Sequence, residues 1–163
     1  MRKTIFKAVA QRIREAVPEI RHVSLWNEHM AEITKVTAWP TPSVFVQFEE
    51  YQVRHCGQHV YQADVPVVLH IVTRAKVFPA GYEDSRLDDA LEYFALIDRV
   101  HVAMSTLSGE NFSTLMLTTS STNHNHDELL ESIERFVTRA QFTEAARKGQ
   151  AVTVAHVKIT EKE

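Results

Sequence analysis

The strongest hydrophobic periodicity in this sequence lies in residues 85–109, SRLDDALEYFALIDRVHVAMSTLSG. Apolar residues recur there at helical spacing and occupy more than one face, which predicts a long helix that packs against partners over much of its surface. Ser85 and Asp88 are expected to cap the start of this helix, and Gly109 is expected to end it. The rest of the chain is predicted to be organised around this helix.

The N-terminal half of the chain reads as one helix and several strands. The segments are an amphipathic helix at 2–17 ended by Pro18, a short strand at 21–26, a proline-bearing connector at 27–42, a strand at 43–51 extended by 51–55, a hairpin turn at Gly57 and a long strand at 58–74. The second half of the long strand is apolar on both faces, so we expect it to be covered on both faces or paired with another subunit. Pro66 cannot donate to a ladder, which indicates an edge or a bulge.

The C-terminal half contains one segment that the pattern leaves open. A loop is expected at 75–84, a strand at 111–120, a polar turn at 121–127 and a final strand at 151–160. Residues 128–147 fit two structures. Leu129, Ile133 and Phe136 favour an amphipathic helix, whereas Phe136, Ala140 and Phe142 alternate as a strand that would pair back onto 111–120.

Composition limits the class of protein without identifying a function. The 163 residues suit one domain, 1–163, with a core at about 2–145 and the C-terminal strand at about 151–160. The net charge is −3 and the basic residues are scattered, so no nucleic-acid-binding stripe is expected. The single cysteine, Cys56, rules out an internal disulfide and fits a reducing compartment. A charged N-terminus without an apolar stretch is unlike a signal peptide, so we expect a cytoplasmic protein.

Two clusters contain residue types that bind metals. His55, Cys56 and His59 surround Gly57, and neutral imidazole and thiolate are good zinc ligands. A structural zinc site needs four ligands, however, and a surface hairpin turn explains this cluster as well.

The second cluster lies in the segment STNHNHD. His124 and His126 would point to the same side of an extended segment, and Asp127 or a neighbouring subunit would supply a third ligand. A polar turn rich in Asn and Asp explains the segment without a metal. We therefore assign no metal or cofactor, and keep both clusters as candidates.

No catalytic signature is found, so the remaining candidates concern interfaces. Asp88 and Asp89 are best explained by the dipole at the start of a helix. The apolar excess of the long strand and the long helix indicates an oligomer interface. The interface candidates are Trp26, Trp39, Pro66, Val68 and Val72.

The order of elements resembles that of the tail terminator and tail-completion proteins of long-tailed bacteriophages and prophages. The resemblance covers residues 2–145. It is carried by the strand VYQADVPVVLHIVTR, the loop with Tyr82, the helix 87–107 followed by Ser108-Gly109, the strand FSTLMLTTS and the turn with Asn125-His126-Asp127. It implies an α+β fold, with a mixed or antiparallel sheet packed against the N-terminal helix and the long central helix. It also implies that 131–142 is a strand, whereas the strand at 151–160 is extra to the family pattern.

The resemblance also implies a function. Family members form a homo-oligomeric ring, often a hexamer, that ends the tail tube and joins it to the head connector. They have no enzymatic activity and no cofactor. Such a protein would assemble in the cytoplasm of a bacterial host and reside in the virion tail. Two alternatives stay open: a cytoplasmic protein–protein adaptor with Trp26, Trp39 and Phe45 on an exposed patch, and a small metal-dependent enzyme that uses the histidine loops.

Overall fold

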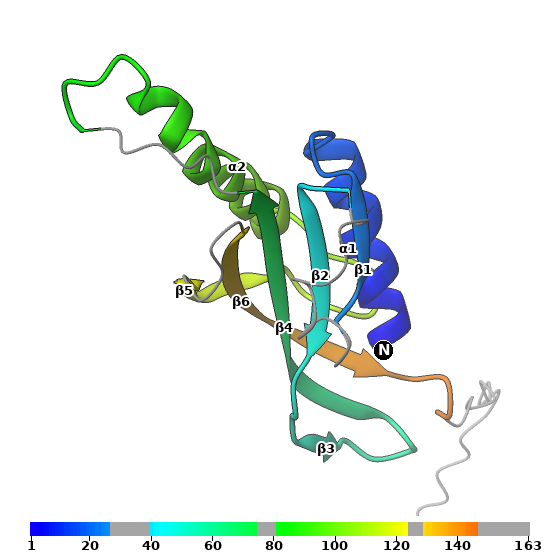
Figure 1. Cartoon of the computed structure of the whole chain (residues 1–163). Coiled ribbons are helices and arrows are strands. Elements are labelled where there is room, and N and C mark those ends of the chain that lie inside the picture. Colours follow the sequence, from blue (N-terminus) through cyan, green and yellow to red (C-terminus); the bar gives the residue numbers. More distant parts are fainter. Residues whose placement is uncertain (27–39, 75–80, 124–128, 147–163) are drawn as a thin grey trace, which may run out of the picture.

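A computed structural model describes residues 1–26, 40–74, 81–123 and 129–146 of the chain (Figure 1). The elements in chain order are α1 (Arg2–Ala16), β1 (His22–Leu25), β2 (Ser43–Phe48), β3 (Val53–His55), β4 (Tyr61–Arg74), α2 (Leu87–Ser105), β5 (Met116–Asn123) and β6 (Leu129–Phe142). The predicted connector with Trp39, the turn with His124, His126 and Asp127, and the strand at 151–160 lie outside the described residues.

The strands form a mixed sheet in the order β1-β2-β4-β6-β5, and β3 pairs with the beginning of β4. β1 and β2 are parallel, and the other pairs are antiparallel. The longest ladder joins β4 to β6 from Tyr61 opposite Phe142 to Arg74 opposite Leu129. Helices together with a mixed sheet confirm the α+β prediction.

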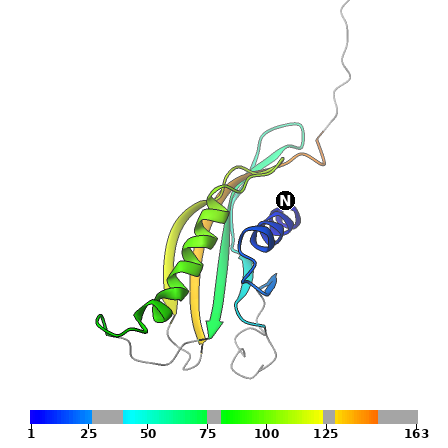
Figure 2. The same ribbon diagram turned by 90° about the horizontal axis from the view of Figure 1, so that it is seen from above.

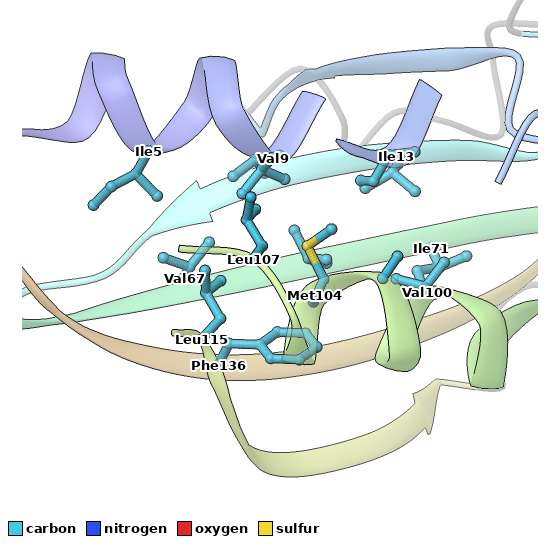
Figure 3. Close-up of a cluster of buried hydrophobic side chains, with 14 of the residues drawn as sticks. Ile5, Val9, Ile13, Val67, Ile71, Val100, Met104, Leu107, Leu115 and Phe136 are labelled. Atoms are coloured by element: carbon cyan, nitrogen blue, oxygen red, sulfur yellow. The ribbon is translucent and has the colours of Figure 1, made fainter. Parts of the chain in front are cut away.

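Both described helices pack against the same side of the sheet, which we call the helix face (Figures 1 and 2). Alternation along β4 directs Val67, Leu69 and Ile71 to the helix face and Val68 and Val72 to the opposite face. Figure 3 shows side chains of both helices meeting over the strands. The centre of this core comprises Ile5, Val9, Ile13, Val67, Ile71, Val100, Met104, Leu107, Leu115 and Phe136. The opposite face has a smaller cluster around Phe45 and Val72.

The helices follow their hydrophobic spacing, but the capping predictions for α2 are wrong. In α1, Ile5, Val9 and Ile13 recur every four residues and are buried. The N-cap residue of α2 is Arg86, and no side chain caps it. α2 ends at Ser105, four residues before Gly109, because the chain then turns back and Leu115 N donates to Leu107 O at 3.2 Å.

Gly109 has a packing role instead of ending the helix. A Cβ at this position would lie 2.3 Å from a ring carbon of Phe112, which is itself buried. The turn between α2 and β5 therefore requires a residue without a side chain. The absence of Cβ, rather than any special backbone angle, explains this glycine.

The predicted edge position of Pro66 is also wrong, because β4 lies in the centre of the sheet. Pro66 is opposite Val137 of β6. On its other side the β2 ladder ends at Val67 and the β3 ladder ends at Ala63. The proline therefore lies in a gap between two short partner strands, where a missing N–H donor costs no ladder bond. The long strand begins at Tyr61 rather than at residue 58, after the confirmed hairpin turn at Gly57.

The open segment is a strand, and the helical interpretation of its first half is wrong. β6 pairs with β4 on one side and with β5 on the other. Hydrogen bonds to both neighbouring strands satisfy the backbone N–H and C=O groups of β6. Strand pairing therefore outweighs the helical spacing of Leu129 and Ile133. β5 begins at Met116 rather than at residue 111, and continues to Asn123, where a polar turn was predicted.

Candidate interaction surface

The first metal candidate forms the tight hairpin between β3 and β4. Gly57, Gln58 and His59 all have positive φ angles, of 85°, 48° and 62°. The rings of His55 and His59 are 6.4 Å apart, and Cys56 is exposed. No group of three or more His, Cys, Asp or Glu side chains in the described part of the chain is arranged to hold a metal ion.

The interface candidates on the opposite face are mostly packed within the subunit. Trp26 stacks on His70 with ring centroids 3.7 Å apart and contacts Phe45 edge-on. Val68 and Val72 are 1% and 3% exposed, and Pro66 is half-buried. Of the candidates within the described residues, Trp26 and Pro66 are half-buried and still have surface that a partner could cover. The role of these residues in an interface stays a prediction.

His70 links three strands on the opposite face. Its Nδ1 lies 2.8 Å from Glu131 Oε1, and its Nε2 lies 2.8 Å from Gln47 Oε1. Asn123 of β5 donates to the second Glu131 oxygen at 2.8 Å. The imidazole of His70 is therefore packed and hydrogen-bonded within the subunit. The partner carboxylate was missed because the strand assignment of residues 128–147 had been left open.

A second histidine–carboxylate pair lies on the helix face. His101 of α2 places Nε2 2.6 Å from Glu134 Oε2, and Glu134 is 0% exposed. Ser120 Oγ donates to the other Glu134 oxygen at 3.0 Å, and Ser132 Oγ also donates to that oxygen. Both serines therefore bond to the carboxylate instead of to His101, which is unlike a nucleophile activated by an adjacent base. The pair anchors α2 to β6.

A cavity of about 550 Å³ lies where β4 ends, beside the N-terminal half of α2 and the turn after α1. Its lining residues are Pro18, Glu19, Arg21, Thr41, Pro42, Thr73, Arg74, Asp89, Glu92, Tyr93, Leu96, Arg99 and Leu130. We call this the helix-end cavity. It combines apolar walls with charges of both signs, and Arg99 pairs with Glu19 at 3.0 Å.

Two hydroxyl groups belong to this cavity. Thr73 is 8% exposed, and its Oγ1 is buried without a hydrogen-bond partner. Burial raises the pKa of the Tyr93 hydroxyl, whose oxygen, like that of Thr73, is buried without a hydrogen-bond partner among the described residues. The lining thus combines the apolar Pro18, Pro42, Leu96 and Leu130 with six charged side chains and two threonines.

An exposed turn precedes α2. Asp84 N donates to Gly81 O at 2.9 Å, and Tyr82 between them is 92% exposed. Arg86 donates to Asp84 Oδ1 from its backbone N and Nε, and to Oδ2 from Nη2 at 2.8 Å. The Arg86 side-chain bonds, followed by the backbone bond, hold the pKa of Asp84 below its usual value. We call residues 81–86 the Tyr82 turn.

Further apolar side chains are exposed along α2 and at the edge of the sheet. Leu91, Phe94 and Val102 of α2 are 44%, 54% and 68% exposed. Met116 and Leu117 of the terminal strand β5 are 61% and 39% exposed. β5 contains neither a charged residue nor a proline, the residues that commonly protect a free edge. Within the described residues, no helix is long and apolar enough to cross a membrane.

Comparison with known proteins places the fold. No protein-family model matches the sequence, and no curated protein matches it. Among solved structures, a chain of the "Virion of native gene transfer agent (GTA) particle" matches with a TM-score of 0.50 and 14% sequence identity. The match covers 84% of this chain and 94% of that chain. The fold of this protein is therefore similar to that of a virion component.

Proposed function

We propose that this protein is a structural component of a phage or prophage tail or neck. In this role it forms a ring that ends the tail tube and joins it to the head connector. Its partners are further copies of itself, the tail-tube protein and the connector protein. Assembly takes place in the bacterial cytoplasm, and the ring then resides in the virion. The protein acts through surfaces rather than through catalysis.

The observation that carries this proposal is the fold match to a virion chain over most of both chains. Two features of the surface agree with a multimer. Among the described strands β5 lies at an edge and carries no protective charges, and α2 exposes Leu91, Phe94 and Val102. Exposed apolar groups and unpaired strand edges are typical of surfaces that another protein covers. The predicted anchors Trp26, Trp39 and Pro66 are proposed to contribute to contacts with partner proteins.

The test is the multimeric state together with the shape of the assembly. Purified protein is measured by size-exclusion chromatography with light scattering, alone and with the tail-tube protein encoded near its gene. We expect a defined multimer that negative-stain microscopy shows as a ring with a central opening. A protein that stays monomeric at tens of micromolar in both samples would refute the proposal.

A further inference from the structure

The helix-end cavity contains a hydroxyl whose burial is unexplained by any contact among the described residues of the subunit. Thr73 is 8% exposed, yet its Oγ1 has no hydrogen-bond partner. Buried polar groups in native proteins nearly always have a partner, because burial without one is unfavourable. Thr73 lines the cavity next to Leu130, its cross-strand neighbour. The missing partner is therefore expected to enter through the cavity.

The Tyr82 turn has the opposite property, since it presents a large side chain that packs against nothing. Tyr82 is 92% exposed, so it does not occupy the cavity of its own subunit. Within the turn, Arg86 donates two side-chain hydrogen bonds to Asp84, on the C-terminal side of Tyr82. In Figure 1 this turn leads into the bright-green start of α2, which projects beyond the end of β4. Tyrosine on an ordered projection is a frequent anchor of protein interfaces.

We propose that Tyr82 of one subunit inserts into the helix-end cavity of a neighbouring copy of this chain, where its hydroxyl bonds to Thr73. A phenol both donates and accepts hydrogen bonds, so it suits a threonine hydroxyl in either direction. The ring would lie against Leu96 and Leu130. This inference rests on the proposed function, because it names the contact that holds the ring together.

Volume and charge support this occupant. The cavity of about 550 Å³ exceeds the space of one side chain and admits the tip of the turn as well. Glu83 follows Tyr82 and is exposed, and the lining of the cavity contains exposed Arg21 and Arg74 together with the carboxylates of Glu19, Asp89 and Glu92. A position of Glu83 beside Arg74 and away from these carboxylates would orient the incoming turn.

The positions of the Tyr82 turn and the helix-end cavity also define the symmetry of the contact. The turn precedes α2, whereas the cavity lies between the N-terminal half of α2, the end of β4 and the segment after α1. A contact between two different surfaces of one chain is heterologous, and such contacts close into rings when the rotation allows it. Leu91 and Phe94 extend the apolar surface from the turn along α2, so the second copy would cover them too.

Cysteine cross-linking tests the contact directly. In a Cys56→Ser background, Glu83→Cys is combined with Arg74→Cys, and the protein is oxidised under dilute conditions. We expect a ladder of covalent oligomers larger than dimers that disappears on reduction. Either single-cysteine variant serves as the control and gives dimers at most. A multimer that forms without a ladder refutes this contact and leaves the proposed ring intact, whereas a monomer refutes both.

A mutant cycle tests the hydrogen bond. We expect Tyr82→Ala to weaken subunit association at least tenfold, because an anchor side chain is lost. Tyr82→Phe and Thr73→Val should each weaken association about fivefold, and the double variant no more than either alone, because one bond is removed. Val53→Ala is the control, since Val53 is 54% exposed on β3, away from the contact. Additive losses, or equal losses in the control, would overturn the assignment.

Discussion

Replacing His101 by alanine tests the account of how α2 is held on the sheet. His101 Nε2 lies 2.6 Å from Glu134 Oε2, and Glu134 is 0% exposed. The two serine hydroxyls bond to the other carboxylate oxygen, so His101→Ala removes the hydrogen bond that Oε2 accepts. The variant therefore leaves a buried carboxylate with two of its three hydrogen bonds, both at Oε1.

The structure sets the expected magnitude. Removing one hydrogen bond to a charged group costs about 1.5–3 kcal/mol, and breaking a buried pair costs about 3–5 kcal/mol. The His101 side chain is 22% exposed, so water can enter where the imidazole was removed and solvate part of the charge. We therefore expect the free energy of unfolding to fall by about 2–4 kcal/mol. A domain of ordinary stability, about 5–15 kcal/mol, stays folded after such a loss.

Urea unfolding followed by circular dichroism measures this loss, with an unchanged dependence on denaturant as evidence of an intact fold. Adding Glu134→Gln should recover part of the loss, because it removes the stranded charge. Arg99→Ala is the matched control on the same helix. Its ion pair with Glu19 is exposed on both sides, at 41% and 47%, so the expected cost is about 0–1 kcal/mol. Equal losses in His101→Ala and Arg99→Ala would refute the reasoning.

Three further predictions follow from local geometry. Gly109→Ala should lower the free energy of unfolding by about 1–3 kcal/mol, measured in urea, because its Cβ would lie 2.3 Å from the Phe112 ring. Since Arg86 lowers the pKa of Asp84, the stability of the Tyr82 turn is present above pH 3.8 and is lost as the pH falls through the folded-state pKa. NMR titration of Asp84 should show a midpoint that Arg86→Gln moves upward, and an unmoved midpoint would contradict the pairing. Because burial raises the pKa of Tyr93 above 10.0, its contribution to stability is present below pH 10 and is lost at higher pH. Ultraviolet absorbance should detect this late ionisation, and Tyr93→Phe should remove it.

The helices and the central strand illustrate how far local pattern carries a prediction. The four-residue recurrence of Ile5, Val9 and Ile13 is sufficient to predict α1 and its buried face. Val67, Leu69 and Ile71 on one side of β4 and Val68 and Val72 on the other are apolar, and all five are buried in the structure. In both cases the hydrophobic pattern of one segment is enough to predict the element and its buried positions. The reason is that buried positions recur with the period of the helix or the strand itself.

The functional surface was less accessible to such reasoning. Trp26 was identified as a candidate anchor, but its stacking on His70 depends on strands that are distant in sequence. The helix-end cavity collects residues from five separate segments, and the missing partner of Thr73 becomes visible only when every neighbour is known. Tyr82 was noted in the sequence only as part of a loop, whereas its exposure of 92% identifies it as a candidate contact.

The sequence by itself determined the position of most elements and the two-sided burial of β4, since hydrophobic period and proline positions act locally. The α+β class was implied by the family that the order of these elements resembles. Tertiary structure alone decided that β6 is a strand, because its backbone pairs with β4 and β5 at the same time. It likewise decided that Pro66 of the central strand faces the gap between β2 and β3. It also decided that Glu131 and Glu134 bond to histidines on opposite faces of the sheet. The physical reason is the same in each case. The free energy of these residues depends on partners that only the folded chain brings within reach.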